Sequence, residues 1–215
     1  MKIGILGTGM VGNTIGSKLI EKGYEVKMGS RSAQNEKAAE WVAKSGSKAS
    51  QGTFKDAATF GEILFNCTKG EVSLEVLRQA GAENLKGKIL ADVSNALDFS
   101  KGRPPGLLTD SHNSLGEMIQ KEFPDLKVVK TLNTTNCSIM VDASLIKGEH
   151  DIFVCGNDAE AKKTISNLLA KDFGWNNIID LGDIVGARAA EMLLPMWVRL
   201  YGIYGHANFN FHIVK

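Results

Sequence analysis

Short apolar runs alternate with helix-like segments along nearly the whole chain. The apolar runs predict strands at residues 2–6, 24–28, 48–51, 63–67, 88–93, 127–132, 151–156 and 178–181. Apolar residues three and four apart predict helices at residues 13–22, 35–45, 54–60, 71–80, 114–123 and 159–173, the helix at 114–123 with Asn113 as its cap. This alternation predicts an α/β fold with a doubly wound parallel sheet. Right-handed crossovers would then place the carboxyl end of every strand on one edge of the sheet.

The most specific pattern lies in the first two dozen residues. The apolar run 2–6 is followed at once by Gly7-Thr8-Gly9-Met10-Val11-Gly12 and then by a helix-like stretch. Strand, glycine-rich turn and helix are the context in which this spacing predicts a Rossmann dinucleotide site, although an ordinary strand–helix turn is the alternative. Gly7 would permit the tight turn, Gly9 would let the backbone approach a pyrophosphate, and Gly12 would let the helix lie close to the strand. The pyrophosphate would sit on the positive end of the helix.

The residues after the second strand indicate which dinucleotide is bound. NAD-preferring sites usually carry an acidic residue there, but Gly29 occupies this position and no carboxylate occurs between Glu25 and Glu36. Ser30 and Ser32 offer hydroxyl groups, Arg31 offers a planar cation that can pair an oxyanion, and Lys37 could add a point charge. The alternative is that Arg31 is a solvated surface residue. We predict NADP(H) as the cofactor.

Two polar clusters follow later strands on the predicted ligand edge. Ser94-Asn95 begins an irregular segment that runs to residue 110, and Asn133-Thr134 directly follows the strand 127–132. Together with Thr68, these residues would meet where an open parallel sheet binds its ligand. Asn95 and Asn133 are therefore expected to line a pocket, although turn formation and helix capping would explain the same residue types.

Composition and charge exclude several classes of partner. The 215 residues include 25 basic and 24 acidic side chains, so the net charge is +1, and no long run of one sign occurs. Because the charges are balanced, we expect no nucleic-acid partner and no basic patch that binds a membrane. The longest apolar stretch is also too short to span a bilayer. The three cysteines are widely spaced and predict free thiols in a reducing cytoplasm.

No pattern of catalytic or metal-binding residues is visible in the sequence. The four histidines are scattered, and no motif with metal-ligand spacing occurs, so we expect no metal. A reductase that moves a hydride between two cofactors needs little acid–base help. We therefore expect direct hydride transfer without a catalytic side chain.

The last thirty residues differ in character from the rest. Apolar residues crowd a helix that is interrupted at Pro195, and such a helix is normally buried under its own sheet or against a second subunit. We divide the chain into an NADP-binding domain, residues 1–182, and a C-terminal helical extension, residues 183–215. Residues 192–204 are expected to form part of a homodimer contact and to close the nicotinamide pocket through Met196 and Trp197, which core packing would also explain.

The order and spacing of several segments resemble the deazaflavin-dependent NADP oxidoreductases, the reductases of coenzyme F(420). The resemblance covers nearly the whole chain, and extends more weakly to the cytosolic reductase domain of the six-transmembrane metalloreductases. The segments that carry it are Gly7-Thr8-Gly9, Gly29-Ser30-Arg31, Asp92-Val93-Ser94-Asn95-Ala96-Leu97, Val129-Lys130-Thr131-Leu132-Asn133-Thr134, Val154-Cys155-Gly156-Asn157-Asp158-Ala159 and Ala187-Arg188 through Leu194.

The resemblance implies a dimeric reductase that binds a small-molecule redox acceptor on the exposed face of the nicotinamide. NADP(H) would contact Thr8, Gly9, Met10, Val11, Ser30 and Arg31, with Thr68 and Asn95 near the nicotinamide. The chain departs from the founding members at two places. Asn133 stands where they carry a histidine, and Lys69-Gly70 where they carry Pro-Trp. Both departures fall where the deazaflavin is expected.

The leading hypothesis is therefore an NADP(H)-dependent reductase that exchanges a hydride with a deazaflavin, a flavin or a similar planar acceptor. One alternative is an NADPH-dependent reductase of a small imine or carbonyl substrate, which would need a proton donor near Thr68, Asn95 or Asn133. Another is a non-catalytic protein that senses NADP(H).

Overall fold

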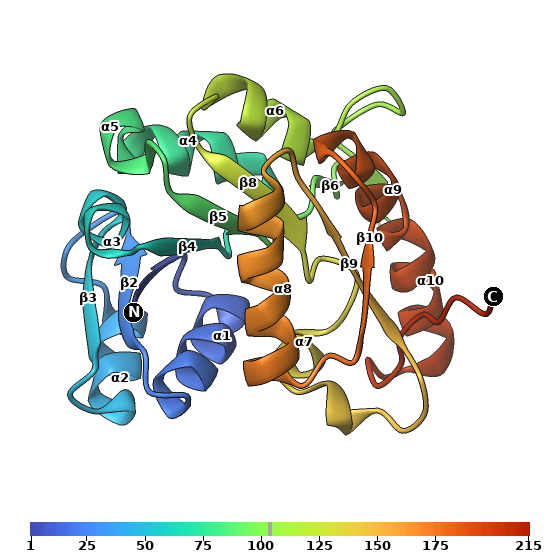
Figure 1. Ribbon diagram of the computed structural model, residues 1–215, viewed down its shortest axis with the longest axis horizontal. Helices are drawn as coiled ribbons and strands as arrows, with labels where there is room; N and C mark the ends of the chain where they lie inside the picture. The colour runs from blue at the N-terminus through green and yellow to red at the C-terminus, as the bar shows by residue number, and fades with distance from the viewer. Residues whose placement is uncertain (103–104) are drawn as a thin grey trace.

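An eight-stranded sheet forms the centre of the molecule in the computed structural model, which describes residues 1–102 and 105–215 (Figure 1). The strands lie in the order β10-β9-β8-β5-β4-β1-β2-β3. Their bounds are β1 Lys2–Leu6, β2 Glu25–Ser30, β3 Ala49–Thr53, β4 Ile63–Asn66, β5 Ile89–Asp92, β8 Lys127–Thr131, β9 Asp151–Cys155 and β10 Asn177–Asp180. Helices cover both faces, which confirms the doubly wound α/β class.

Each face of the sheet has its own hydrophobic core, because successive side chains of a strand point to opposite faces. Ile3 and Ile5 of β1 face one core, and Leu6 faces the other. The first core is covered by α1 Met10–Glu21, α2 Glu36–Ser45, α7 Cys137–Val141 and α8 Ala159–Phe173. The second is covered by α3 Phe54–Phe60, α4 Gly70–Ala80, α5 Ala82–Leu85, α6 Leu115–Glu122 and α9 Ala187–Met192. Each fully buried Leu, Ile or Phe contributes about 1.5–3 kcal/mol relative to an exposed one.

The last two strands run against the rest of the sheet. Six strands, β3 to β8 in spatial order, are parallel, but β9 pairs antiparallel with β8, and β10 is parallel to β9. The expectation that every strand ends on one edge is therefore wrong for β9 and β10. Only a short helix and the 3-10 turn η1 Ala143–Leu145 lie between β8 and β9, and this connection enters β9 from the ligand edge.

Local capping chemistry sets several helix boundaries. Thr53 and Asp56 form a reciprocal capping box at the start of α3, and Asp158 accepts from the backbone N–H of Ala161 at the start of α8. Gly174 ends α8 in the left-handed conformation, as its lack of a Cβ permits. The cap of α6 is Ser114 rather than the predicted Asn113, whose side chain instead accepts from the backbone N–H of Ser114.

The segment after β5 is less irregular than expected. Two short strands, β6 Leu97–Asp98 and β7 Gly106–Leu107, form a small antiparallel hairpin within it. Residues 103–104 of this segment lie outside the described residues. Helix α1 also begins earlier than predicted, at Met10, so the glycine-rich turn leads into it without a gap.

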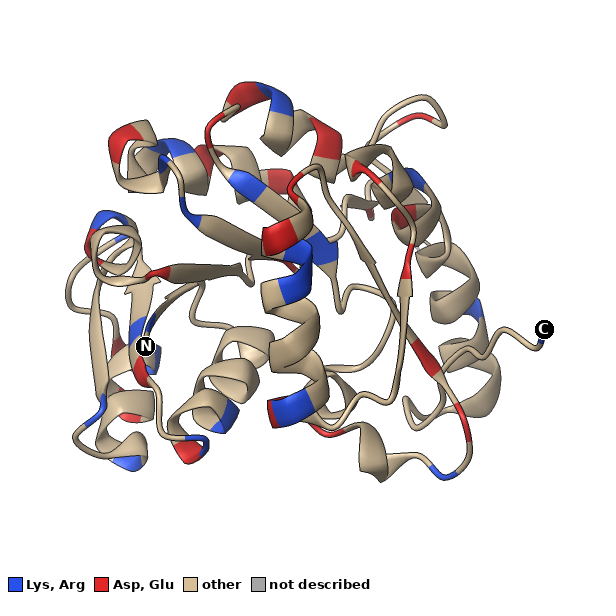
Figure 2. Cartoon of the chain, in the orientation of Figure 1, with Lys and Arg blue, Asp and Glu red and all other residues tan. Residues whose placement is uncertain are grey.

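The C-terminal helices are divided as the proline suggests. After the 3-10 turn η2 Ile184–Gly186, helix α9 ends at Met192, and α10 Leu194–Tyr204 begins with Pro195 in its first turn. Leu194 is the one buried residue of α10, so its own sheet does not cover it. Figure 2 shows charged residues on most of the longer helices, whereas the 11-residue α10 carries a single one, Arg199. Across the described ranges, no helix is both long and apolar enough to cross a membrane.

Candidate functional site: a dinucleotide cleft

The glycine-rich turn has a distinct geometric reason for each glycine. Gly7 has a φ of 117°, and a Cβ added to it would lie 2.9 Å from the carbonyl oxygen of Cys67. A Cβ on Gly12 would lie only 2.2 Å from the carbonyl oxygen of Gly7, so α1 packs directly on the turn. A Cβ on Gly9 would meet no atom within 4 Å. The space above Gly9 is therefore open, as a bound pyrophosphate would require.

The first turn of α1 is available to an anion. Gly9 is the N-cap of this 12-residue helix and provides no side-chain hydrogen bond. No acidic residue lies in the first turn. The N-terminal N–H groups and the positive end of the helix dipole thus face the open space without a competing carboxylate.

The end of β2 excludes an acidic side chain by packing. A Cβ on Gly29 would lie 2.8 Å from the Cβ of Ala57 and 3.1 Å from the carbonyl oxygen of Thr53. Any side chain at position 29 would therefore have to displace α3. The acidic side chain with which NAD-preferring sites bind the ribose has no room here.

The residues that follow Gly29 offer a cation and hydroxyl groups. Ser30 is buried, and its Oγ donates to the backbone oxygen of Ser32 and accepts from the backbone N–H of Ser32. The Oγ of Ser32 donates to the backbone oxygen of Gln34. Arg31 is exposed, and no carboxylate among residues 1–102 and 105–215 forms an ion pair with it. A phosphate at this turn would meet a cation that has no other partner in the part of the chain that the structure describes.

A cleft of about 680 Å³ joins the glycine-rich turn to the end of β2. Seven of the predicted cofactor residues line it: Gly7, Thr8, Gly9, Ser30, Arg31, Ser32 and Thr68. Residues from α3 and α4 form the opposite wall, namely Phe54, Val72, Glu75, Val76 and Gln79. Sequence reasoning missed this wall, although the spacing of residues 72, 75, 76 and 79 is that of one helix face.

The remaining predicted cofactor residues lie outside this cleft. Met10, which is 75% exposed, and Lys37 line a neighbouring hollow of about 1050 Å³ between α1, α2 and α7, which shares Thr8 and Gly9 with the cleft. Gly12 is buried, and Val11 is partly buried against the first core. Lys37 therefore lines a different hollow from Arg31, although both hollows reach Thr8 and Gly9.

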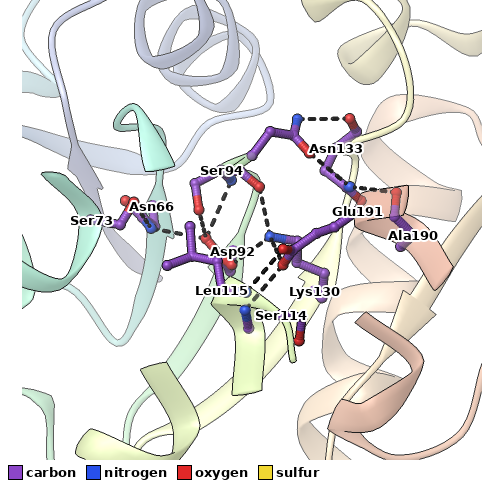
Figure 3. Close-up of polar contacts among 12 residues, drawn as sticks. Asn66, Ser73, Asp92, Ser94, Ser114, Leu115, Lys130, Asn133, Ala190 and Glu191 are labelled. Carbon is purple, nitrogen blue, oxygen red and sulfur yellow. Dashed lines mark hydrogen bonds and ion pairs between the residues drawn. The ribbon is translucent and has the colours of Figure 1, made fainter. Parts of the chain in front are cut away.

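The predicted polar clusters meet at the ligand edge of the sheet (Figure 3). The Nδ2 of Asn95 donates to the backbone oxygen of Asn133 at 2.9 Å, and the Nδ2 of Asn133 donates to the Oδ1 of Asn95 at 3.0 Å. The Nδ2 of Asn133 also donates to the backbone oxygen of Ala190 in α9. Asn133 is 2% exposed, so this amide pair also joins the C-terminal helices to the sheet.

The segment after β8 shows two further unusual features. Leu132 has a φ of 60°, the left-handed region that a side chain rarely adopts, and its side chain is fully buried. The hydroxyl groups of Thr134 and Thr135 are buried and have no hydrogen-bond partner in the structure. Strain and unpaired polar groups commonly cluster at ligand sites.

A second set of hydrogen-bonded polar side chains orients Thr68. Its Oγ1 donates to the Oδ1 of Asn66 at 2.6 Å, and the Nδ2 of Asn66 donates to the Oδ1 of Asp92 at 2.9 Å. Thr68 is thereby oriented from below while it remains partly exposed at the cleft. Neighbouring Cys67 is unsuited to act as a thiolate, because burial and, secondarily, the charge of Asp92 raise the pKa of its thiol.

Met196 and Trp197 lie on α10, away from the cleft. Met196 is 55% exposed, and the Trp197 ring stacks between Tyr201 and Phe209 at centroid distances of 5.6 and 5.3 Å. The described parts of the chain contain no group of three His, Cys, Asp or Glu residues that could hold a metal ion.

This combination of sheet, glycine-rich turn and open cleft defines a protein of the Rossmann dinucleotide-binding class. Residues 2–96 match the family described as NADP oxidoreductase, coenzyme F(420)-dependent. A crystal structure from Arthrobacter sp. FB24, provisionally named an F(420)-dependent NADP reductase, is 48% identical with a TM-score of 0.95, and the alignment covers 100% of both chains. The chain belongs to the coenzyme F(420)-dependent NADP oxidoreductase family.

Two curated proteins are also similar over long stretches. The F(420)-dependent NADP reductase of Methanocaldococcus jannaschii is 32% identical over 147 residues, which cover 68% of this chain and 65% of that protein. Metalloreductase STEAP3 of Rattus norvegicus is 30% identical over 201 residues, which cover 91% of this chain and 38% of that protein. The chain thus spans less than two thirds of the length of either relative.

Proposed function

We propose that the chain is an NADP(H)-dependent oxidoreductase that transfers a hydride between NADPH and coenzyme F(420), a flavin or a similar planar acceptor. The observation that carries the cofactor assignment is the turn at residues 29–32. Packing excludes a side chain at Gly29, and Arg31 has no other partner among the described residues, so a 2′-phosphate is attracted and not repelled. NADP(H) supplies the hydride at C4 of its nicotinamide when bound, and the chain supplies its alignment with the acceptor.

The cofactor would lie across the glycine-rich turn. Its pyrophosphate would occupy the open space above Gly9, with Thr8, Met10 and Val11 along its course and Lys37 in the neighbouring hollow. Thr68 and Asn95 would flank the nicotinamide at the ends of β4 and β5. The acceptor would stack on the exposed nicotinamide face beside Asn133 and Thr134. Met196 and Trp197 of α10, which lie away from the NADP(H) cleft, would close the acceptor pocket on its far side.

Reduction of an imine or carbonyl substrate is less well supported, because such a reaction needs a proton donor at the nicotinamide. Lys130 is the ionisable group beneath the Asn95–Asn133 pair. Burial alone would lower the pKa of its ammonium, but the charges of Asp92 and Glu191 outweigh burial and raise this pKa, so the proton is retained. Imine reductases share the fold, as in the enzyme from Myxococcus stipitatus with a TM-score of 0.64, but at 20% identity the likeness shows the fold alone.

Two further proposals concern the protein's state. Because α10 carries exposed Met196, Tyr201, Ile203 and Tyr204, we assign it to the interface of a homodimer. The cytoplasm is the proposed location, since the three cysteines are free thiols.

Anaerobic turnover assays test the proposed reaction. Loss of NADPH absorbance is followed with coenzyme F(420), FMN and FAD as separate acceptors. Turnover with at least one of them, at a rate that saturates with NADPH, is the expected result. Tight NADPH binding without turnover on any planar acceptor would favour a nucleotide-sensing role and refute the reductase proposal.

A further inference from the structure

A fully buried ion network lies beneath the proposed nicotinamide site. The Nζ of Lys130 in β8 lies 2.8 Å from the Oδ2 of Asp92, 2.6 Å from the backbone oxygen of Ser94 and 2.9 Å from the Oε1 of Glu191 (Figure 3). The three protons of the ammonium are thus matched by three acceptors, and all three charged side chains are at most 2% exposed.

Glu191 brings the C-terminal helices into this network. Its Oε2 accepts from the backbone N–H of Leu115 at 2.9 Å, and its Oε1 accepts from that of Gly116 at 3.1 Å, so it also binds the first turn of α6. The preceding residue, Ala190, accepts from Asn133 through its backbone oxygen. Two consecutive residues of α9 therefore hold the end of β8 and the segment after it, and Lys130 links them to the end of β5 through Asp92.

The seating of α9 determines where α10 lies. Only Leu193 separates the two helices, and α10 itself has little packing of its own, since Leu194 is its single buried residue. The contacts of α9 must therefore supply most of the orientation of α10. A network in which every donor and acceptor is satisfied has one favourable geometry, which makes it a suitable anchor.

Stability alone is a weak explanation for this network. A buried ion pair can often be replaced by apolar residues of similar volume without loss of stability, because desolvation offsets much of the attraction. The carboxylate at position 191 instead provides directed bonds to three groups in two segments, namely the ammonium of Lys130 in β8 and the backbone N–H groups of the first two residues of α6.

We propose that Glu191, acting through Lys130, is a positioning residue that seats α9 and α10 against the ends of β5 and β8 and so sets the acceptor side of the site. This inference rests on the proposed function. In this proposal the C-terminal helices determine the geometry of the acceptor pocket and not that of the NADP(H) cleft.

The test compares two carboxylates that join the same pair of helices. Glu191→Gln removes the buried charge, and Glu117→Gln removes the carboxylate that binds Arg188 of α9 at the molecular surface. For Glu191→Gln we expect the Kd of NADPH to stay within about twofold, while kcat/KM for the acceptor falls by about tenfold or more, as misalignment of reacting groups produces. For Glu117→Gln we expect both values to stay within about twofold.

Hydrogen exchange provides a readout that needs no acceptor. Glu191→Gln is expected to speed amide exchange in residues 187–204 but not in α1 or β1, and Glu117→Gln is expected to speed it less. Unchanged exchange in residues 187–204, or equal losses of NADPH affinity and acceptor turnover, would overturn the positioning role. If the wild type turns over no planar acceptor, the proposed function fails, while the exchange result still decides whether Glu191 seats these helices.

A triple variant guards against misfolding of the single one. Asp92→Asn, Lys130→Met and Glu191→Gln together remove all three buried charges, so no carboxylate is left buried without a cation. The triple variant is expected to fold and to show the same separation between NADPH binding and acceptor turnover. Wild-type acceptor kinetics in a folded triple variant would contradict the proposal.

Discussion

Gly29 at the end of β2 and Ala57 in α3 lie so close that a Cβ on the glycine would be 2.8 Å from the Cβ of the alanine. Contacts this short do not occur between real Cβ atoms, so an acidic residue at position 29 would require α3 to move. The preference for a phosphorylated ribose is thus supported by packing as well as by charge. The packing of β2 against α3 excludes the carboxylate, and Arg31 supplies the attraction for the phosphate.

Arg31→Gln should weaken NADPH binding much more than NADH binding. A charge-assisted hydrogen bond contributes about 1.5–3 kcal/mol, which corresponds to a roughly ten- to hundredfold loss of NADPH affinity. Isothermal titration with both dinucleotides measures this difference. Lys37→Gln is the matched control and should cost less, because Lys37 lines the neighbouring hollow and not the cleft that holds Arg31. Equal losses for NADPH and NADH in Arg31→Gln would contradict the 2′-phosphate assignment.

Gly9→Ala should impair nucleotide binding, whereas Gly12→Ala should lower the stability of the fold. The new Cβ at position 9 meets no protein atom, so the melting temperature should hardly change while NADPH affinity falls. At position 12 the Cβ would lie 2.2 Å from a backbone oxygen that cannot rotate away. Although alanine gains about 1 kcal/mol in helix propensity, overpacking should prevail and lower the free energy of unfolding by about 1–3 kcal/mol. Calorimetry and dinucleotide titration of both variants separate the two effects.

The ion pair between α6 and α9 should make stability depend on pH in the acid range. Hydrogen bonding to Arg188 lowers the pKa of the Glu117 carboxyl, and this effect outweighs burial, which would raise the pKa. A lowered folded-state pKa gives stability that is present above the unfolded value, about 4.3, and is lost as the pH falls through the folded value. Arg188→Met should therefore be less stable than the wild type at pH 7, and the difference should shrink below about pH 4.3. A difference that stays constant with pH would indicate lost side-chain packing instead of lost charge.

Ile203→Glu should dissociate the proposed homodimer. Ile203 is 61% exposed on α10, and a carboxylate there would be buried without a partner at an apolar interface. Sedimentation velocity of the wild type should show a dimer, and that of the variant a monomer. Leu145→Glu, at a similarly exposed apolar residue of η1, should leave the dimer intact. A monomeric wild type would remove the basis for this assignment.

Local sequence patterns were sufficient where the physical cause is itself local. The apolar runs of β1 and β2 and the glycines at 7, 9 and 12 depend on residues within a few positions of one another. The same holds for Ser30 and Arg31, whose positions are set by the end of β2. These features predicted the fold class and one side of the cleft.

Long-range relationships could not be predicted in this way. The sequence of β8 does not show that Lys130 is buried, because its partners Asp92 and Glu191 lie far away along the chain. The direction of β9 depends on the path between two strands, and the pattern of β9 itself is the same in either direction. The wall formed by Phe54 and Val72 depends on how α3 and α4 pack together over the second core.

The reversal of the chain after β8 also affects how the protein can be labelled. Since β9 and β10 point away from the cleft, the turns that follow them, at residues 156–158 and 181–183, emerge on the opposite rim of the molecule. A fluorophore or affinity handle attached at one of these turns would report on the protein from a distance, without obstructing the nucleotide.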